Sequence, residues 1–534
     1  MRRSLSTRAA AAAGAFVATV AVSTGAVVAV PGAALPSLTT PAAVRGPVAE
    51  LDLETATAAD LRDMVVSGEV SSLDLTRAYL DRIALLNTDG PGLNAVRSLN
   101  PSAAADARLR DRDLRIGREP GPLHGVPVLI KDNIDVKGMP TTAGSIALEN
   151  SYPATDAPLV TALEAAGAVI VGKTNLSEFA NFMTSGMPSG YSSLGGQVLN
   201  PYDASVTPSG SSSGTGAGIA AGMSPIGVGT ETSGSILSPA QANSLAAVKP
   251  TVGLISRTGV IPISATQDTA GPMTKTVLDS ALLLEGLVSV DPEDPVTAGA
   301  EPFVGFSYAD ALSETSLEGA RLGYVNSNNP LFAAALETLA AEGAILVPVT
   351  VPNTSAPGIL FDEFERDLNA YFSRLPASAP MDTLSDVIAF NEGRPEIKFG
   401  QTILQQSEAV DLTDPATLAT YEANRDRGLA ESRGNIDAVL TSNDLDAIVS
   451  LSGTTGVAAR AGYPSVSVPA GYTATNGRPS NVTFMSTAFT EATLLRLAYD
   501  YEQASLLREP PSVINPTLFR CLEPVRERAA SCAP

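Results

Sequence analysis

Histidine and cysteine are almost absent from this chain of 534 residues, which contains one histidine, His124, and two cysteines, Cys521 and Cys532. Serine hydrolases usually activate the serine with a histidine, because a neutral imidazole accepts a proton near pH 7. One histidine and two cysteines near the C-terminus also fail to make the usual nitrogen and sulfur ligand sets of a zinc site. The scarcity therefore argues against zinc hydrolysis and restricts the serine chemistry that is open to the chain.

Residues 210–214 read Gly-Ser-Ser-Ser-Gly and match the G-x-S-x-G form of a nucleophile elbow. That design places the histidine after the serine in the chain, whereas His124 precedes it, so an α/β-hydrolase triad is disfavoured. No phosphate-binding P-loop motif occurs either. A serine hydrolase with a lysine base remains, and such a lysine must be buried so that its pKa falls. Only six of the 34 basic residues are lysines, and Lys131 stands at the end of the apolar run VPVLI.

Acidic residues outnumber basic ones, 56 to 34, which gives a net charge of -22. Binding to nucleic acid or to an anionic membrane needs a basic surface, so the charge argues against both partners. The hydrophobic content of 44% is ample for a globular core. No metal or cofactor is expected, and the oligomeric state is left open.

The N-terminus has the pattern of a signal peptide, with basic MRRSLSTR, an uncharged apolar run over residues 9–30, and small residues near Ala29 and Ala34. The run is rich in Ala, Gly, Ser and Thr, so its weak hydrophobicity favours cleavage over a retained membrane anchor. We predict a signal peptide over residues 1–34 and a linker over residues 35–47. The protein is then secreted or extracytoplasmic, with no stable membrane partner after cleavage.

Residues 512–534 are predicted to be a C-terminal tail that carries both cysteines. In an exported protein, Cys521 and Cys532 could form a disulfide that closes a short loop. Their separation of 11 residues permits this pairing without establishing it, so two free thiols remain the alternative.

Helical and strand patterns alternate between residues 48 and 511, which is typical of α/β proteins. Thr57 is expected to cap one helix and Ser72 the next. Val126 to Ile130 is a strand candidate that delivers Lys131 at its end. Residues 360–438 are helix-rich, more charged and less regular, which suggests a lid or substrate-facing insertion. We predict one large α/β domain over residues 48–511.

A tract from Pro208 to Pro239 consists almost entirely of Gly, Ser, Thr and Ala. Such a composition usually indicates a flexible linker. Here the tract contains a small-residue helix pattern and a short apolar run, and its neighbours on both sides are apolar. Glycines inside a domain let backbone approach backbone or substrate closely. We therefore interpret the tract as an active-site scaffold.

Ordered motifs along nearly the whole chain beyond the leader resemble the amidase signature family. They are GPLHGVPVLIKDNI, TTAGSIAL, GAVIVGKTNLSEFAN, SGSSSGTGAGIAAG, GTETSGSI, AAVKPTVGLISRTGVIPIS, QDTAGPMTKTVLD, AGYPSVSVPAGY and LLRLAYDYEQA. The forms GSSSG and GTETSGSI are most similar to the exported, peptide-amidase-like branch. The resemblance implies a mixed, mainly parallel central sheet covered by helices on both faces.

The resemblance also implies a Ser-Ser-Lys triad. By that likeness Ser235 is the nucleophile, and Ser211, which follows a cis peptide bond, relays the proton to neutral Lys131. Backbone N–H groups of Thr232, Ser233, Gly234 and Ser235 would form the oxyanion hole, where one donor is worth on the order of a hundredfold in rate.

The remaining polar residues of these motifs are expected to be structural. Ser212 and Ser213 are interpreted as hydrogen-bonded turn residues, His124 as part of a turn, and Lys173 and Lys249 as structural. Glu231 is expected to hold its turn by accepting backbone N–H bonds. Two residues depart from the family pattern: Leu237 replaces an arginine, and Ser233 replaces a glycine or an acidic residue. At a positive φ angle a serine in position 233 would be strained.

We predict an exported amidase that hydrolyses linear carboxamides, with C-terminal peptide amides among the first candidates, to acid plus ammonia or amine through an acyl-enzyme. Two alternatives stay open. One is an amidotransferase-like subunit, which the leader and the acidic charge oppose. The other is a catalytically silent binding protein on the same fold, which only Ser233 and Leu237 favour.

Overall fold

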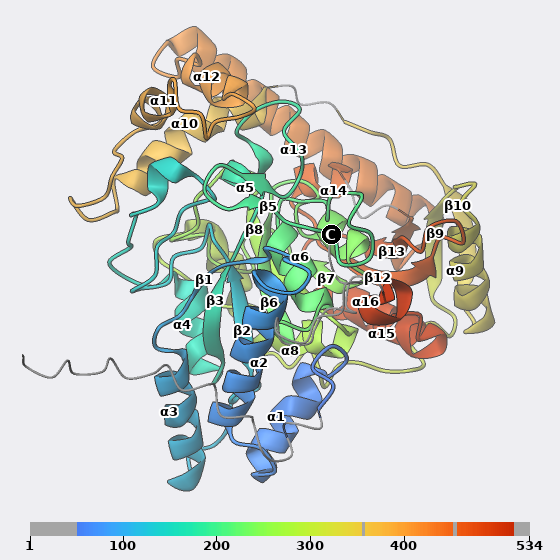
Figure 1. Ribbon diagram of the computed structural model, residues 1–534. Coiled ribbons are helices and arrows are strands. Elements are labelled where there is room, and N and C mark those ends of the chain that lie inside the picture. The colour runs from blue at the N-terminus through green and yellow to red at the C-terminus, as the bar shows by residue number, and fades with distance from the viewer. Residues whose placement is uncertain (1–47, 49–50, 355–357, 452–455, 517–534) are drawn as a thin grey trace, which may run out of the picture. The chain divides into compact units, whose positions relative to one another are not determined.

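An 11-stranded sheet lies at the centre of the fold (Figure 1). The computed structural model describes residues 48, 51–354, 358–451 and 456–516, all within one compact unit, Val44–Pro534. The predicted signal peptide, the linker and both cysteines lie outside the described residues. Within those residues, no helix is long and apolar enough to cross a membrane.

The strand order is β1-β3-β2-β6-β8-β7-β12-β13-β11-β9-β10, so β2 and β6 are neighbours in the interior of the sheet. The strands of this sheet are β1 (Val96–Leu99), β2 (Pro127–Lys131), β3 (Val169–Thr174), β6 (Ile226–Glu231), β7 (Ala246–Lys249), β8 (Thr269–Thr274), β9 (Arg321–Val325), β10 (Ile345–Val349), β11 (Ala447–Ser450), β12 (Ser465–Tyr472) and β13 (Pro479–Met485). A separate two-stranded sheet pairs β4 (Tyr191–Ser192) with β5 (Gly196–Gln197).

The predicted α/β class, with one mixed sheet between helices, is confirmed, but the sheet is not mainly parallel. Parallel pairs join β3, β2 and β6 toward one end and β11, β9 and β10 at the other. The pairs between β6 and β13 in the strand order, the edge pair β1–β3 and the pair β11–β13 are antiparallel. Short connections such as residues 473–478 between β12 and β13 permit only antiparallel pairing, because a parallel pair needs a long crossover.

Helices cover both faces of the sheet, as strand alternation requires. In β2, Val128 and Ile130 belong to one apolar cluster and Leu129 to another, because successive strand residues point to opposite faces. The first cluster includes residues of α4 (Pro158–Ala165), α8 (Val277–Glu285), α9 (Pro330–Ala341) and α15 (Glu491–Ser505). The second includes residues of α2 (Ser72–Asn87), α3 (Ala103–Arg115), α6 (Ser213–Ala220) and α7 (Leu237–Ala242).

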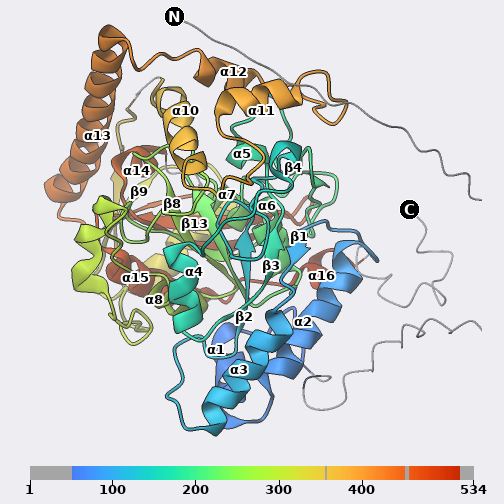
Figure 2. The same ribbon diagram turned by 90° about the vertical axis from the view of Figure 1, so that its left-hand side faces the viewer.

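The helix-rich segment predicted over residues 360–438 forms a group of its own. It contains α10 (Ile359–Phe372), α11 (Leu384–Asn391), α12 (Thr402–Glu408) and α13 (Pro415–Asn443). Figure 2 shows α10, α11 and α12 side by side, with α13 along the same side of the molecule. Apolar side chains of α10, α11 and α12 form a third cluster together with residues of α5 (Glu178–Asn181) and of the loops around it, whereas Ile436 and Leu440 of α13 belong to another cluster. The remaining short helices are α1 (Ala58–Ser67), α14 (Gly456–Ala461), α16 (Pro511–Ile514) and the 3-10 helices Ile146–Leu148 and Pro295–Phe303.

Helix caps agree with the sequence at one helix and differ by one residue at the next. Thr57 caps α1, because its side chain accepts the N–H of Asp60. Helix α2 is capped by Ser71 rather than by Ser72. The Ser72 hydroxyl is buried and donates instead to the carbonyl of Gly125 at 3.1 Å, so a tertiary contact takes the residue that local sequence assigns to the cap.

Candidate active site

Lys131 is the last residue of β2, and its side chain is fully buried. By strand alternation it shares the face of Leu129, which α6 and α7 cover. Its Nζ atom lies 2.8 Å from the Ser211 Oγ atom, 2.8 Å from the Thr230 Oγ1 atom and 3.2 Å from the Thr230 carbonyl oxygen. Three segments that are distant in sequence therefore meet at one amine.

The surroundings of Lys131 favour the neutral amine. Burial lowers the pKa of Lys131 to about 7, while the charges of Asp268 and Glu231 act in the opposite direction. No carboxylate in the described ranges makes an ion pair with it, whereas Lys173 lies 3.1 Å from Asp132. A group with a pKa near 7 is about half neutral at pH 7, so its lone pair can accept a proton.

Ser211 lies in the loop that precedes α6, with a fully buried side chain. The peptide bond before it is cis, as the family resemblance implies. Its carbonyl accepts the N–H of Ser177 at 3.1 Å. Immediately beyond, a Cβ atom on Gly214 would overlap the backbone oxygens of Ala95 and Asn175. Small residues thus allow this loop to lie directly against neighbouring backbone.

Ser235 lies in the turn between β6 and α7, and 8% of its surface is exposed. Its carbonyl accepts the N–H of Ser212 at 3.2 Å, so this turn is tied to the loop of Ser211. Its hydroxyl makes no hydrogen bond with any residue in the described part of the chain. It is therefore an accessible hydroxyl beside the lysine–serine contact.

Glu231 holds this turn, as predicted. Its Oε1 atom accepts the N–H of Gly234 at 2.7 Å, and its Oε2 atom accepts those of Ile236 and Leu237 at 2.8 and 3.0 Å. The N–H of Gly234 is thereby committed to Glu231, although the resemblance implies it as an oxyanion donor. The other three members of the implied set, Thr232, Ser233 and Ser235, have N–H groups that donate to nothing in the described residues.

The two departures from the family pattern are accommodated locally. The positive φ angle of this turn, +86°, belongs to Gly234, and Ser233 has a negative one. The Ser233 side chain is exposed, so a serine fits there without backbone strain. Leu237 is fully buried in the same apolar cluster as Ile236 and Ala240.

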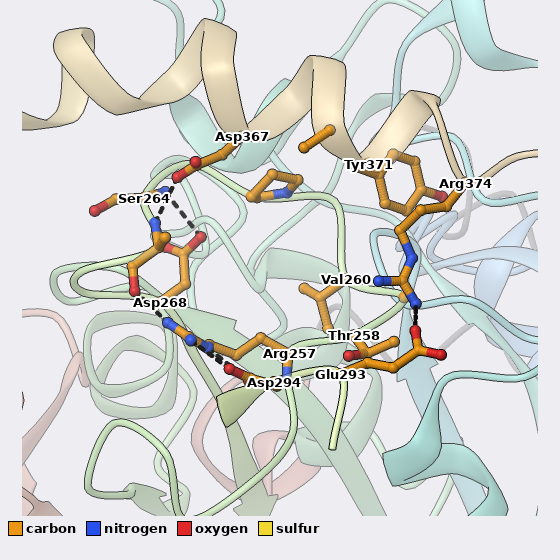
Figure 3. Close-up of a pocket in the computed structure, with 14 residues that line it drawn as sticks. Arg257, Thr258, Val260, Ser264, Asp268, Glu293, Asp294, Asp367, Tyr371 and Arg374 are labelled. Atoms are coloured by element: carbon orange, nitrogen blue, oxygen red, sulfur yellow. Dashed lines mark hydrogen bonds and ion pairs between the residues drawn. The ribbon is translucent and has the colours of Figure 1, made fainter. Parts of the chain in front are cut away.

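A cavity of about 240 Å³ has Asp268 and Tyr371 among the residues that line it (Figure 3). Its walls come from α10 and from the segment 257–268, and none of the three implied triad residues lines it. Two ion pairs line it, Arg257 with Asp294 and Arg374 with Glu293. Asp268 connects the cavity to the turn of residues 232–235, because its Oδ1 atom accepts the hydroxyl hydrogen of Thr232.

The helix-rich insertion, residues 360–438, contacts residues 177–191. This segment begins at Ser177, whose N–H donates to the Ser211 carbonyl. The rings of Phe182 and Phe364 lie 5.0 Å apart, and those of Tyr191 and Phe399 lie 4.9 Å apart. The hydroxyl oxygens of Thr184 and Thr402 are 2.9 Å apart. Residues 177–191 therefore contact the Ser211 loop through Ser177 and the insertion through their aromatic and hydroxyl side chains.

The remaining motif residues make internal contacts that agree with a structural role, although Ser213, interpreted as a turn residue, is the first residue of α6. Ser212 exchanges hydrogen bonds with backbone atoms of Thr230, and the Ser213 hydroxyl donates to the Ser209 carbonyl at 2.6 Å. His124 is buried, with a ring nitrogen 3.1 Å from the Arg110 carbonyl oxygen. Lys173 pairs with Asp132, and Lys249 donates to the carbonyls of Pro250 and Tyr463.

Sequence reasoning missed two residues of the site, Thr230 and Asp268. Thr230 lies within GTETSGSI, and its hydroxyl oxygen accepts from the Asn133 amide at 3.0 Å besides lying beside Lys131. Strand pairing would have indicated it, since β2 and β6 are parallel and their ends meet. Asp268 lies in QDTAGPM, where nothing local distinguishes it from an ordinary turn aspartate.

The fold and this site define a class of protein, an α/β enzyme with a buried lysine against paired serine loops, and comparison with known proteins agrees. The amidase family model matches residues 74–450. A probable amidase of Arabidopsis thaliana is 41% identical over 479 residues, which cover 86% of this chain and 92% of the relative. The native peptide amidase of Stenotrophomonas maltophilia is 41% identical, with a TM-score of 0.82, over 87% of this chain and 99% of that one.

A glutamyl-tRNA(Gln) amidotransferase of Salinispora tropica also has a similar chain, at 36% identity over 67% of this chain and 71% of the relative. The chain belongs to the amidase signature family, and its likeness to the peptide amidase supports the peptide-amidase-like branch. It is accordingly a hydrolase of amide bonds.

Replacing Glu231 with glutamine should destabilise the protein by about 1 to 3 kcal/mol. The carboxylate accepts three N–H bonds through two oxygens, whereas an amide has only one oxygen. Urea unfolding measures this change as a lower midpoint. Glu337→Gln is the matched control, since Glu337 is exposed on α9 and should shift the midpoint little. Equal midpoints for the two variants would contradict the role assigned to Glu231.

Proposed function

We propose that this protein hydrolyses linear carboxamides by a Ser-Ser-Lys triad of Ser235, Ser211 and Lys131. The observation that carries the proposal is the contact of 2.8 Å between the Lys131 Nζ and Ser211 Oγ atoms, made in a site where burial lowers the pKa of the lysine to about 7. A neutral amine beside a hydroxyl is the arrangement that general-base activation of a serine requires.

In this mechanism the Ser235 Oγ atom attacks the amide carbon while Ser211 takes its proton and passes its own to neutral Lys131. The developing oxyanion accepts N–H bonds from the turn, of which those of Thr232, Ser233 and Ser235 are uncommitted in the described part of the chain. Ser211 then delivers a proton to the leaving amine, regaining one from Lys131. An acyl-enzyme on Ser235 remains, and water hydrolyses it through the same relay.

The proposed substrates are C-terminal peptide amides and similar linear amides, cleaved to acid plus ammonia or amine. The similarity to a peptide amidase over 99% of that chain supports this choice.

An amidotransferase-like role is the second candidate, favoured by the similarity to the glutamyl-tRNA(Gln) amidotransferase chain. That similarity covers 67% of this chain, against 87% for the peptide amidase. The two roles separate in one assay, because an amidase releases ammonia from a peptide amide without a partner protein. The silent-binder alternative loses one of its two supports, since Ser233 is unstrained in the turn.

Ser235→Ala should abolish ammonia release from a peptide amide, and Lys131→Ala should reduce it by a factor on the order of 10³ or more. Ser205→Ala and Lys137→Ala are the matched controls, because both residues are exposed and neither belongs to the triad. A fluorophosphonate probe should label Ser235 in the native protein and nothing in Ser235→Ala. Full activity in Ser235→Ala would refute the triad, and failure to label native protein would favour the silent binder.

Activity should rise with pH through about 7 and level off above it, because burial lowers the pKa of Lys131 to about 7 and only the neutral amine accepts a proton. The measurement is kcat/KM for a peptide amide between pH 5 and 9, together with the rate of fluorophosphonate labelling. Both profiles should share the same acid limb. A rate that still rises at pH 9, as the ordinary lysine pKa of about 10.4 requires, would show that the site leaves Lys131 charged.

We also propose that the protein is exported, because MRRSLSTR and the uncharged run over residues 9–30 have the signal-peptide pattern. Fractionation of expressing cells should find the mature protein outside the cytoplasm, without residues 1–34 by mass. Deletion of residues 1–34 should keep it inside. Cytoplasmic full-length protein would instead revive the amidotransferase-like candidate.

A further inference from the structure

We name residues 232–235, which contain the proposed nucleophile Ser235, the nucleophile turn. Its first residue, Thr232, is bound by two consecutive residues, Gln267 and Asp268. Its hydroxyl donates to the Oδ1 atom of Asp268, and its carbonyl accepts from the Nε2 atom of Gln267 at 3.1 Å. All three residues are buried. Since both its side chain and its peptide group are fixed, the direction of the following N–H, that of Ser233, is fixed as well.

Asp268 belongs to a loop that closes on itself, which we name the bridge loop, residues 263–268. Its second carboxylate oxygen, Oδ2, accepts the N–H groups of Ile263 and Ser264 at 2.7 and 2.9 Å. Burial raises the pKa of Asp268 to about 6, while its hydrogen bonds and the nearby Arg257 act in the opposite direction. Asp268 is thus ionised at neutral pH, with its hydrogen bonds divided between the bridge loop and the nucleophile turn.

Two acidic side chains of α10, one helical turn apart, accept hydrogen bonds from the same loop. Buried Glu363 accepts from the Ser264 hydroxyl and from both the hydroxyl and the N–H of Thr266. Asp367 accepts the N–H of Ala265 at 2.7 Å. Figure 3 shows Asp367 and Asp268 on opposite sides of Ser264. The bridge loop therefore connects the insertion to the nucleophile turn.

A purely local role for Asp268 explains only half of its contacts. Closing a tight loop by accepting nearby N–H groups is a common use of aspartate, and it accounts for Oδ2. It does not account for Oδ1, which reaches a residue 36 positions away, nor for the amide of Gln267 on the same target. Both of these contacts converge on Thr232.

We propose that Asp268 and Gln267 are positioning residues for the oxyanion hole, which act by fixing Thr232 and with it the N–H groups of the nucleophile turn. This inference rests on the proposed Ser-Ser-Lys function. Catalysis by such donors requires them to be aimed before the oxyanion forms, so a turn that is displaced by a fraction of an ångström loses rate rather than binding.

The test compares variants of the full chain with a peptide amide as substrate. Thr232→Val removes the hydroxyl at nearly constant shape and should lower kcat on the order of 10- to 100-fold, with KM changed less than about threefold. Thr232→Ser retains the hydroxyl and should stay within about threefold of the native rate. Asp268→Asn should match Thr232→Val, and the double variant should lose no more than Asp268→Asn alone, because both remove one contact.

One further readout and one control variant separate positioning from general stability. The charge of Asp268 raises the pKa of Lys131, so Asp268→Asn should move the acid limb of kcat/KM to lower pH. Glu231 is the other carboxylate that acts on Lys131, and it stays in place. Asp294→Asn is the matched control: Asp294 lines the same cavity and binds Arg257, so this variant should lower the unfolding midpoint but keep kcat and the acid limb.

A native kcat in Thr232→Val would overturn this inference. If a separate sample of that variant is labelled at Ser235 by fluorophosphonate, the proposed function still stands. Additive losses in the double variant would also overturn this inference. A native protein that neither labels at Ser235 nor releases ammonia would overturn both.

Discussion

The burial of the Lys131 amine without a carboxylate partner is the constraint on which the site depends. Desolvating an ammonium group costs several kcal/mol. The described residues include four buried lysines, and their partners are of three kinds. Lys173 has a carboxylate, while Lys249 and Lys275 have carbonyl oxygens, which can only accept. Lys131 has no carboxylate partner but lies against the hydroxyl groups of Ser211 and Thr230, which can donate to a neutral amine as well as accept from a charged one.

Bringing two serine loops to an amine at the end of an interior strand requires backbones to approach closely, and the small-residue tract permits this. A Cβ atom on Gly229 of β6 would lie 2.8 Å from the Ser212 Oγ atom, and one on Gly227 would lie 2.8 Å from a methyl group of Thr215. Side chains of α6, such as Thr215 and Ile219, therefore lie directly on the backbone of the strand. The composition that resembles a linker is a packing requirement, since larger residues would move Ser211 away from Lys131.

The sequence predicted those parts of the structure that depend on local pattern or on an ordered motif. The α/β class, the cap at Thr57, the termination of a strand at Lys131 and the grip of Glu231 on its turn are of this kind. Strand β8 was not recognised, because Gly271 and Pro272 argue against a strand. Pro272 is tolerated because it pairs with Val228 of β6 at a position beyond the short pairing of β8 with β7.

What the sequence could not give is long-range pairing between side chains and backbone. Ser72 has the composition of a helix cap, yet its hydroxyl is used by Gly125, which lies 53 residues away. Asp268 looks like a turn aspartate, and only the fold brings Thr232 to it. The excess of antiparallel pairs is a similar case, because the order of strands across a sheet is not encoded in the pattern of any one strand.

The insertion is connected to both serine loops through intermediate segments, and the two connections differ in character. Apolar and aromatic side chains join it to residues 177–191, which bind the Ser211 carbonyl through Ser177. Acidic side chains of α10 join it to the bridge loop, where backbone N–H groups and hydroxyls would otherwise be buried without partners. The apolar contacts tolerate exchange of one hydrophobic residue for another. The polar contacts do not, because a lost acceptor leaves buried donors unsatisfied. Substitutions are therefore tolerated more readily in the first set of contacts than in the second, which joins α10 to the bridge loop and, through Asp268, to Thr232.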